Sequence, residues 1–234
     1  MNSKWVVIFG LSRAIRRSSK NAIIAELKVY SPKYGDLLRG RDPLEILRKY
    51  ERAGAVGISY ITDPKYFKGS FDFFRKLCQE TELPVLRKDF IKTKEEIERT
   101  AEAGGSAILL ITRLLKDDLP EFVDYAREHG LDTLVEVHTL EELRIAIQTN
   151  STMIGINNRD IGKLELDDGN VSLTEKLAPL IPDRYVKVSE SGISTIEDLK
   201  RALRVADAAL IGTALMKAED PEELLRKFVE VEIC

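Results

Sequence analysis

The sequence predicts one α/β domain, a (β/α)8 barrel with a short N-terminal extension, from three observations. Eight short apolar runs alternate with segments of helical apolar spacing, and such alternation requires parallel strands joined by helical crossovers. A polar or glycine-rich cluster ends most of these runs. The chain has 234 residues, close to the ~250 of a single α/β barrel. We expect the extension at residues 1–21 and the catalytic barrel at residues 22–234.

The eight strands are expected where an apolar run is short and ends in polar residues or glycine. In chain order they are Ile23–Lys28, Val56–Thr62, Pro84–Lys88, Ala107–Thr112, Thr133–Val137, Met153–Asn157, Tyr185–Glu190 and Ala208–Gly212. An open doubly wound sheet is the alternative, and it usually carries a glycine-rich loop after its first strand. The segment Lys28-Val29-Tyr30-Ser31-Pro32 has no glycine, which favours the closed barrel.

Helices are expected between the strands, where apolar residues recur at helical spacing. Examples are Pro43–Ala53, Lys94–Ala103, Leu119–Glu128, Leu140–Gln148 and Ile196–Val205. Capping residues precede several of them: Asp42 stands before Pro43, Thr93 before Lys94, and Thr195 three residues ahead of Asp198. Ahead of the first strand, Trp5–Leu11 is apolar, and we expect it to dock near the barrel mouth.

Composition excludes several classes of function. The 36 basic and 39 acidic residues give a net charge of −3, which provides no general attraction for nucleic acid or an anionic membrane. No apolar stretch approaches the ~20 residues of a membrane helix, so we expect a soluble protein. The two cysteines, Cys78 and Cys234, lack metal-ligand spacing and suit a reducing cytoplasm. The basic cluster at residues 13–17 is interpreted as a solvated helix face.

The charged fraction of 32% exceeds the ~25% of average domains. Helices rich in Glu, Lys and Arg permit ion-pair networks on the surface, so a heat-loving source is one hypothesis.

Ionisable and amide side chains stand near the carboxyl ends of the expected strands, where barrel enzymes build their active sites. They are Glu26, Lys28, Lys88, Glu136, Asn157 and Glu190. Each one alone could belong to a buried structural ion pair. Glu26 and Lys28 are two residues apart, so their side chains share one face of the strand. Because so many charges at strand ends would be a poor coincidence, the joint interpretation is a catalytic site.

A phosphate site is expected after the last two strands. Ser191 and Gly192 follow the seventh strand, and Gly212 and Thr213 end the eighth. These are the loops that commonly hold phosphate in barrels, because glycine permits close backbone approach and hydroxyl groups donate hydrogen bonds. By contrast, His129 and His138 have no partner at metal-ligand spacing and are interpreted as structural, so no metal site is expected.

The ordered motifs of the chain resemble those of the indole-3-glycerol phosphate synthase family. They are Glu26-x-Lys28, Ser31-Pro32, Tyr66-Phe67-x-Gly69-Ser70, Lys88-Asp89-Phe90, Leu134-Val135-Glu136-Val137-His138, Gly155-Ile156-Asn157-Asn158-Arg159-Asp160, Glu190-Ser191-Gly192-Ile193 and Gly212-Thr213. The resemblance implies a carboxy-lyase of tryptophan biosynthesis that converts 1-(2-carboxyphenylamino)-1-deoxyribulose 5-phosphate into indole-3-glycerol phosphate without a cofactor.

The resemblance also implies roles for single residues. Lys88 would be the general acid of ring closure and Lys28 the acid of dehydration, with Glu136 or Glu26 as the base. Asn157 and Glu190 would orient the substrate and the lysines, and Arg159 would face the substrate carboxylate. The remaining substrate contacts would be Ser31 and the four residues that enclose the aromatic ring, Phe67, Phe90, Leu109 and Leu210. Val29 and Lys33 depart from the family pattern, which commonly has a basic residue and a serine there.

Two other interpretations stay open at this point. One is a sugar-phosphate aldolase that uses Lys88 or Lys28 as a Schiff-base nucleophile on the same barrel. The other is a non-catalytic barrel that serves as a partner subunit. The expected partner of the synthase is its small phosphorylated substrate, and association with other enzymes of the pathway also stays open.

Overall fold

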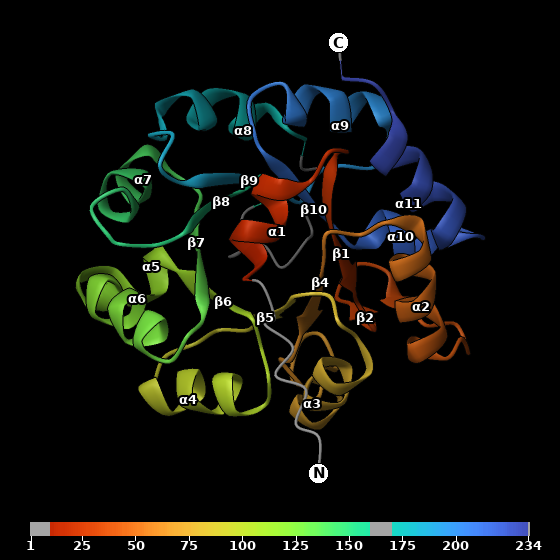
Figure 1. The fold of residues 1–234 in the computed structure, drawn as a ribbon, viewed down its shortest axis with the longest axis horizontal. Helices are drawn as coiled ribbons and strands as arrows, with labels where there is room; N and C mark the ends of the chain where they lie inside the picture. Colours follow the sequence, from red (N-terminus) through yellow and green to blue (C-terminus); the bar gives the residue numbers. More distant parts are fainter. Residues whose placement is uncertain (1–9, 160–169, 234) are drawn as a thin grey trace.

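The barrel is closed by eight parallel strands in the order β1-β10-β9-β8-β7-β6-β5-β4 (Figure 1). A computed structural model describes residues 10–159 and 170–233 of the chain. The strands are β1 Ala22–Leu27, β4 Gly57–Ile61, β5 Val85–Lys88, β6 Ala107–Ile111, β7 Asp132–Val137, β8 Met153–Asn157, β9 Val186–Glu190 and β10 Ala208–Ile211. The expected fold class is therefore confirmed, and each strand end lies within one residue of its expected position.

Helices form a ring around the strands (Figure 1). They are α2 Pro43–Ala53, α3 Phe71–Glu80, α4 Lys94–Glu102, α5 Thr112–Leu115, α6 Leu119–Glu128, α7 Leu140–Ala146, α8 Ser172–Leu177, α9 Ile196–Leu203, α10 Thr213–Lys217 and α11 Pro221–Glu230, with the short 3-10 turns η1 Lys116–Asp118 and η3 Ala178–Leu180. The expected caps are confirmed: the Asp42 side chain accepts from Leu44, and Thr93 and Thr195 each form a capping box.

One side-chain face of each strand points into the barrel, and on several strands the residues along it change from apolar to polar toward the carboxyl end. Ile24, Leu86 and Leu134 belong to the buried cluster that fills the barrel. Two residues further on, at the same face, stand Glu26, Lys88 and Glu136. The two-residue period therefore brings charged groups from different strands to one end of the barrel.

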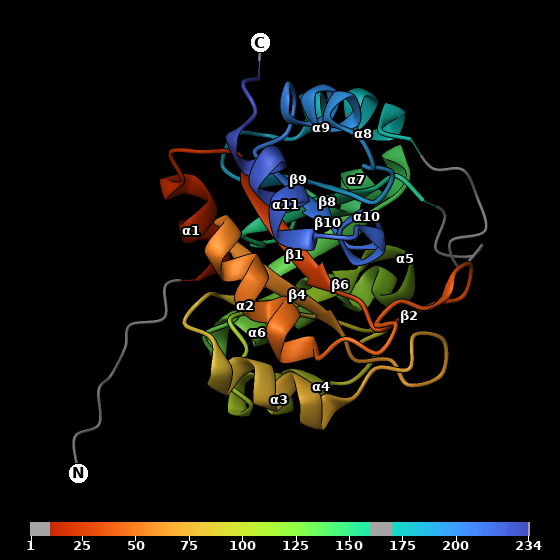
Figure 2. The same ribbon diagram turned by 90° about the vertical axis from the view of Figure 1, so that its right-hand side faces the viewer.

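The helix α1, Leu11–Arg17, covers the opposite end of the barrel (Figure 2). Leu11 is fully buried against the strand starts, and the Ser12 N–H donates to the Asp132 carboxylate at 2.8 Å, where β7 begins. The Arg16 guanidinium donates to the carbonyl oxygen of Arg184 ahead of β9. The prediction that the Trp5–Leu11 segment docks near the barrel mouth is therefore wrong for Leu11. Residues 5–9 of that segment lie outside the described residues.

The loop after β1 contains a small antiparallel hairpin of β2 Tyr30–Ser31 and β3 Gly35–Asp36, which the sequence did not predict. It lies at the end of the molecule opposite α1 (Figure 2).

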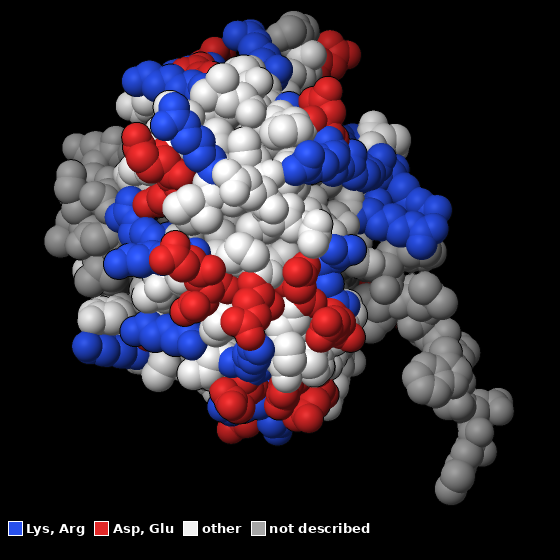
Figure 3. Space-filling view, turned by 90° about the vertical axis from the view of Figure 1, so that its left-hand side faces the viewer, with Lys and Arg blue, Asp and Glu red and all other residues white. Residues whose placement is uncertain are grey.

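Charged side chains of both signs are interspersed over the face shown in Figure 3. Several of the described pairs join neighbouring helices, as expected from the composition. The Glu222 carboxylate of α11 lies 2.7 Å from Arg52 of α2, and Glu175 of α8 lies 2.7 Å from Arg201 of α9. In the described ranges, no helix has both the length and the apolar character needed to cross a membrane.

Candidate active site

A cavity opens at the carboxyl ends of the strands, and all eight strands or the loops after them contribute to its wall. Its lining residues are Glu26, Lys28, Ile61, Phe67, Lys88, Asp89, Phe90, Leu109, Ile111, Glu136, Asn157, Arg159, Ser191, Gly192, Ile193, Leu210, Ile211, Gly212, Thr213 and Ala214. Most residues expected from the sequence to form the site are therefore brought together. Glu190 does not line the cavity, but its carboxylate contacts Lys88, which does.

Lys88 lies at the centre of this site between two carboxylates. Its Nζ atom is 3.0 Å from Oε2 of Glu190 and 3.6 Å from Oε2 of Glu26. Burial alone would lower the pKa of Lys88, but the nearby carboxylates of Glu190 and Glu26 outweigh it and raise that pKa. Lys88 therefore keeps its proton throughout the neutral pH range.

Glu190 is fully buried and reaches Lys88 past Gly155 of β8. A Cβ atom at Gly155 would run into the Oε1 atom of Glu190, so the missing side chain leaves the space that the carboxylate occupies. Burial raises the pKa of Glu190, while Lys88 opposes the shift.

Glu136 is a buried carboxyl group of the cavity wall. Burial, followed by the negative charge of Glu190, raises the pKa of Glu136 to about 8. The Asn157 side-chain amide donates to Glu136 Oε2 at 3.1 Å, and the Asn157 side-chain oxygen accepts from the Arg159 N–H at 3.1 Å. A carboxyl group with a pKa near neutrality can exchange a proton with a substrate at physiological pH.

His138 supports Asn157 from behind. Its Nδ1 atom lies 2.8 Å from the Asn157 carbonyl oxygen, an acceptor, which assigns the ring proton to Nδ1. The structural interpretation of His138 agrees with this contact.

Lys28 is buried beside Phe67, with its Nζ atom 5.2 Å from the centre of the ring. Glu26 near the end of β1 also lines the cavity, but its ion pair is with Lys88. The two lysines and two of the three glutamates thus line one cavity, which gives it several groups able to donate or accept protons.

The apolar part of the wall comes from the four residues expected to enclose an aromatic ring. Phe67, Phe90, Leu109 and Leu210 all line the cavity. Leu109 and Leu210 are buried at 3% exposure each, and the Phe90 ring meets Tyr66 edge-on with centres 6.3 Å apart. A flat apolar group would be shielded from water between these side chains.

The glycine-rich end of the cavity is formed after β9 and β10. Ser191 and Gly192 have positive φ angles of 64° and 75°, so consecutive residues turn the backbone sharply beside the cavity. Gly212 has a different reason to be glycine: its φ is −120°, and a Cβ atom there would run into the Glu26 side chain. Together with Thr213, these residues line this end of the cavity.

A family model described as indole-3-glycerol phosphate synthase matches residues 8–228. The chain belongs to this family. An indole-3-glycerol phosphate synthase of Pyrococcus abyssi is 86% identical over 98% of this chain and 100% of its own length. One of Pyrococcus furiosus is 82% identical over 97% of this chain and 100% of its own length. The tryptophan biosynthesis protein TrpCD of Archaeoglobus fulgidus is 51% identical over 93% of this chain, which covers 40% of that protein.

Ser31, an expected substrate contact, lies away from the cavity wall. Ser31 is fully buried and outside the lining; its hydroxyl oxygen accepts from the N–H groups of Lys33 and Tyr34, which closes the turn of the hairpin. Asp160, the last residue of the Asn-Asn-Arg-Asp motif, lies outside the described residues.

Asn158 is a member of this synthase site that the sequence interpretation left without a role. Its buried side-chain amide donates to the carbonyl oxygens of Glu190 and Ser191 at 2.9 and 3.0 Å. Its side-chain oxygen accepts from the N–H and hydroxyl groups of Thr174. It therefore fixes the turn that carries Glu190 and Ser191. The only sequence signal is its place beside Asn157 at a strand end.

In the described part of the chain, no three His, Cys, Asp or Glu side chains are arranged to hold a metal ion.

Proposed function

We propose that this cavity performs the reaction of indole-3-glycerol phosphate synthase with Lys88 as the general acid of ring closure. The substrate, 1-(2-carboxyphenylamino)-1-deoxyribulose 5-phosphate, is closed to indole-3-glycerol phosphate with release of carbon dioxide and water. The observation that carries the assignment of Lys88 is its buried ammonium group, held by Glu190 and Glu26 at the centre of a cavity with one apolar and one glycine-rich wall.

The two walls suit the two ends of the substrate. The phosphate would lie against Ser191, Gly192, Gly212 and Thr213, and the carboxyphenyl ring between Phe67, Phe90, Leu109 and Leu210. The ketone carbon then lies near Lys88, between the two ends. Arg159, on the cavity wall after β8, is proposed to face the substrate carboxylate.

In ring closure, the ring carbon that carries the carboxylate attacks the ketone carbon. The carbonyl electron pair moves to oxygen, and Lys88 meets the developing oxyanion with its positive charge and donates a proton. The carboxylate then leaves as carbon dioxide, and the electrons of the broken bond restore the aromatic ring. Lys88 needs to be protonated for this step, as its two carboxylate neighbours ensure.

In dehydration, the new hydroxyl leaves as water and a proton is removed from the adjacent CH₂ carbon of the five-membered ring. We assign the acid to Lys28. Glu136 suits the base better than Glu26, because Glu26 is in contact with the ammonium of Lys88 while Glu136 has a pKa raised toward neutrality.

Schiff-base chemistry at Lys88 is disfavoured by the same geometry. A Schiff base forms from an unprotonated amine, whereas two carboxylates within 3.6 Å stabilise the protonated form. The non-catalytic alternative is disfavoured because every expected charged strand end is present and faces the cavity or Lys88.

We further propose that the enzyme works in a reducing compartment and beside other enzymes of tryptophan synthesis. Cys78 is a free thiol, and the A. fulgidus relative carries the matching region within a longer tryptophan biosynthesis protein.

The proposed reaction is tested by supplying the purified chain with the carboxyphenylamino substrate and following the rise of indole absorbance. We expect turnover by protein treated with EDTA and dialysed, without added metal or nucleotide. Activity that disappears on this treatment and returns with one metal ion would contradict the site assignment.

A further inference from the structure

Arg87 precedes the central lysine in β5, and its side chain points out of the barrel rather than into the cavity. It is 4% exposed and does not line the cavity wall. The sequence interpretation gave it no role. A buried guanidinium outside the cavity needs acceptors, and these are supplied by the segments that lead into the cavity.

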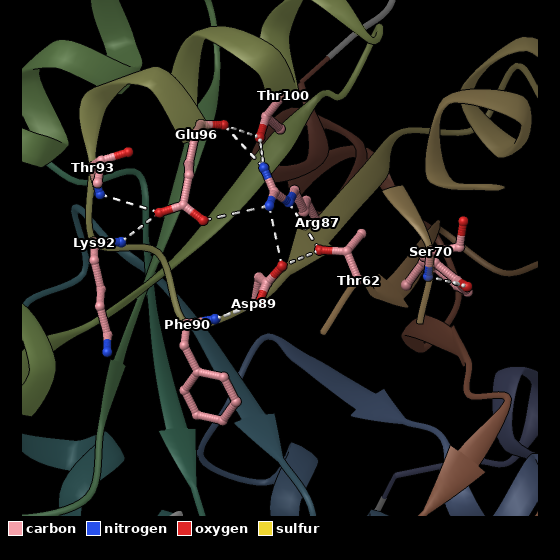
Figure 4. A network of polar contacts seen from close by, with 10 residues as sticks. Thr62, Ser70, Arg87, Asp89, Phe90, Lys92, Thr93, Glu96 and Thr100 are labelled. Carbon is pink, nitrogen blue, oxygen red and sulfur yellow. Dashed lines mark hydrogen bonds and ion pairs between the residues drawn. The ribbon is translucent and has the colours of Figure 1, made fainter. Parts of the chain in front are cut away.

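The guanidinium makes contacts on all sides (Figure 4). Its Nε atom donates to the Thr62 hydroxyl at 3.0 Å, and Nη2 donates to Oδ2 of Asp89 at 3.1 Å. On helix α4, Nη1 donates to the Glu96 carbonyl oxygen and the Thr100 hydroxyl, both at 3.0 Å, and the Glu96 carboxylate lies 3.7 Å from Nη2. One side chain thus joins the loops after β4 and β5 to α4.

The partners of Arg87 form hydrogen bonds with the backbone of Lys88 and of Phe90. The Thr62 N–H donates to the Lys88 carbonyl oxygen at 2.9 Å, and its hydroxyl donates to Asp89. The second oxygen of Asp89 accepts from the Phe90 N–H at 2.8 Å. From this turn the Phe90 ring projects away from Arg87 (Figure 4) and lines the cavity. The Lys88 and Phe90 backbones are therefore both hydrogen-bonded to residues that Arg87 contacts.

Stability alone is a weak reason for such a cluster. Burying a guanidinium with carboxylates removes their hydration, and apolar side chains of similar volume are often as stable or more so. The cluster instead holds the backbone around Lys88 in one conformation. Reacting groups displaced by about 1 Å can lose about 10²-fold in rate.

We propose that Arg87 is a positioning residue of this synthase, which acts through Thr62 and Asp89 to hold Lys88 and Phe90 where the reaction needs them. The inference rests on the proposed function of Lys88. Turnover by the unaltered chain tests that function first, so failure of the reaction and failure of this inference give different results.

The test compares Thr62→Val and Arg87→Lys with a matched control. Thr62→Val keeps the shape of the side chain and removes the hydroxyl. Arg87→Lys keeps the positive charge and removes the planar guanidinium with its several N–H donors. The control is Thr149→Val: Thr149 is also buried, but its hydroxyl donates to the Ala146 carbonyl oxygen on α7, away from the cavity. The measurements are kcat, KM, the melting temperature and the dissociation constant of inorganic phosphate.

We expect Thr62→Val and Arg87→Lys each to lower kcat by about 10- to 100-fold. Phosphate binding should change less than about twofold, because the glycine-rich wall belongs to β9 and β10. Thr149→Val should keep kcat within about twofold, whatever it does to the melting temperature. The inference is overturned if Thr62→Val and Arg87→Lys both keep kcat within about twofold. It is also overturned if kcat and phosphate affinity fall together, which would indicate a general loss of structure in the cavity.

Discussion

The Nζ atom of Lys88 lies 3.0 Å from Oε2 of Glu190, although their strands β5 and β9 stand on opposite sides of the barrel. The contact crosses the interior at the cavity floor and leaves Glu190 with no exposed surface. A buried ion pair of this kind adds little net stability, and removing one partner leaves the other charge uncompensated. Its effect is to hold an ammonium group, protonated, where a substrate oxyanion would form.

Glu190→Gln should lower kcat strongly while leaving the chain folded. The amide fills the same space but no longer supplies the charge that keeps Lys88 protonated and in place, so we expect a loss of about 10²-fold. Steady-state kinetics and circular dichroism check it. Glu230→Gln is the control, because it removes an exposed ion pair with Lys20; equal kinetics for both variants would speak against the role of Glu190.

The assignment of Glu136 as base predicts a pH dependence. A base acts only when deprotonated, and burial raises the pKa of Glu136 to about 8. We therefore expect kcat/KM to fall about tenfold per pH unit as the pH drops below about 8. Glu136→Gln should be much less active and should lose this limb. An unchanged limb in that variant would transfer the role of base to another group.

The same carboxyl group predicts a dependence of stability on pH. Its folded-state pKa lies above the ~4.3 of an unfolded glutamate, so the folded chain binds the proton more tightly. This contribution to the free energy of unfolding is complete below the unfolded pKa and is lost as pH rises through the folded one. Urea denaturation at several pH values should show that the free energy of unfolding declines between the unfolded-state and the folded-state pKa. Glu136→Gln should remove this decline. Equal slopes in both proteins would contradict the raised pKa.

Gly155→Ala should disable the site through Glu190. The added methyl group would occupy the space of the Glu190 carboxylate, which must then leave Lys88. We expect kcat to fall by about tenfold or more, since displacement of a reacting group by 1 Å is already costly. Gly10→Ala is a matched control, because its methyl group would meet the Asp132 carboxylate at the opposite end of the barrel. Comparable kcat losses in both variants would contradict the explanation.

The position of α1 predicts a role in stability rather than catalysis. Leu11 is fully buried at the amino-terminal end of the barrel, remote from the cavity wall. Leu11→Ala should therefore lower the free energy of unfolding by about 2–5 kcal/mol. Values of kcat and KM at a temperature where the variant is folded should stay within about twofold. A large change in KM with unaltered stability would instead place the segment in substrate binding.

The sequence predicts the barrel well because a buried parallel strand has a strong local signal. An apolar run ending in Glu, Lys or Asn marks both the strand and its carboxyl end. Because the active sites of barrels lie at these ends, the cavity residues can be predicted from them. The hairpin β2–β3 has no such signal, since its strands are two residues each. The destination of α1 could not be inferred because its partner Asp132 is 120 residues away from Ser12.

Residues that face away from the cavity are the hardest to find. Arg87 and Asn158 each stand beside an expected site residue, yet their partner Thr62 comes from the loop after β4 and their partner Thr174 from helix α8. Only the folded chain brings such pairs together. The reason for glycine at residue 212 was also incomplete in the sequence interpretation, because the Glu26 side chain that fills the space comes from β1.

Lys88→Met tests the central claim most directly, because it removes the ammonium group and keeps the length of the side chain. The quantity to measure is kcat under conditions where the chemical step limits the rate, with circular dichroism to verify the fold. The account predicts a loss of about 10²–10⁴-fold in kcat, a small change in KM and unaltered inhibition by inorganic phosphate. A folded Lys88→Met protein whose kcat stays within about tenfold of the unaltered chain would contradict the account.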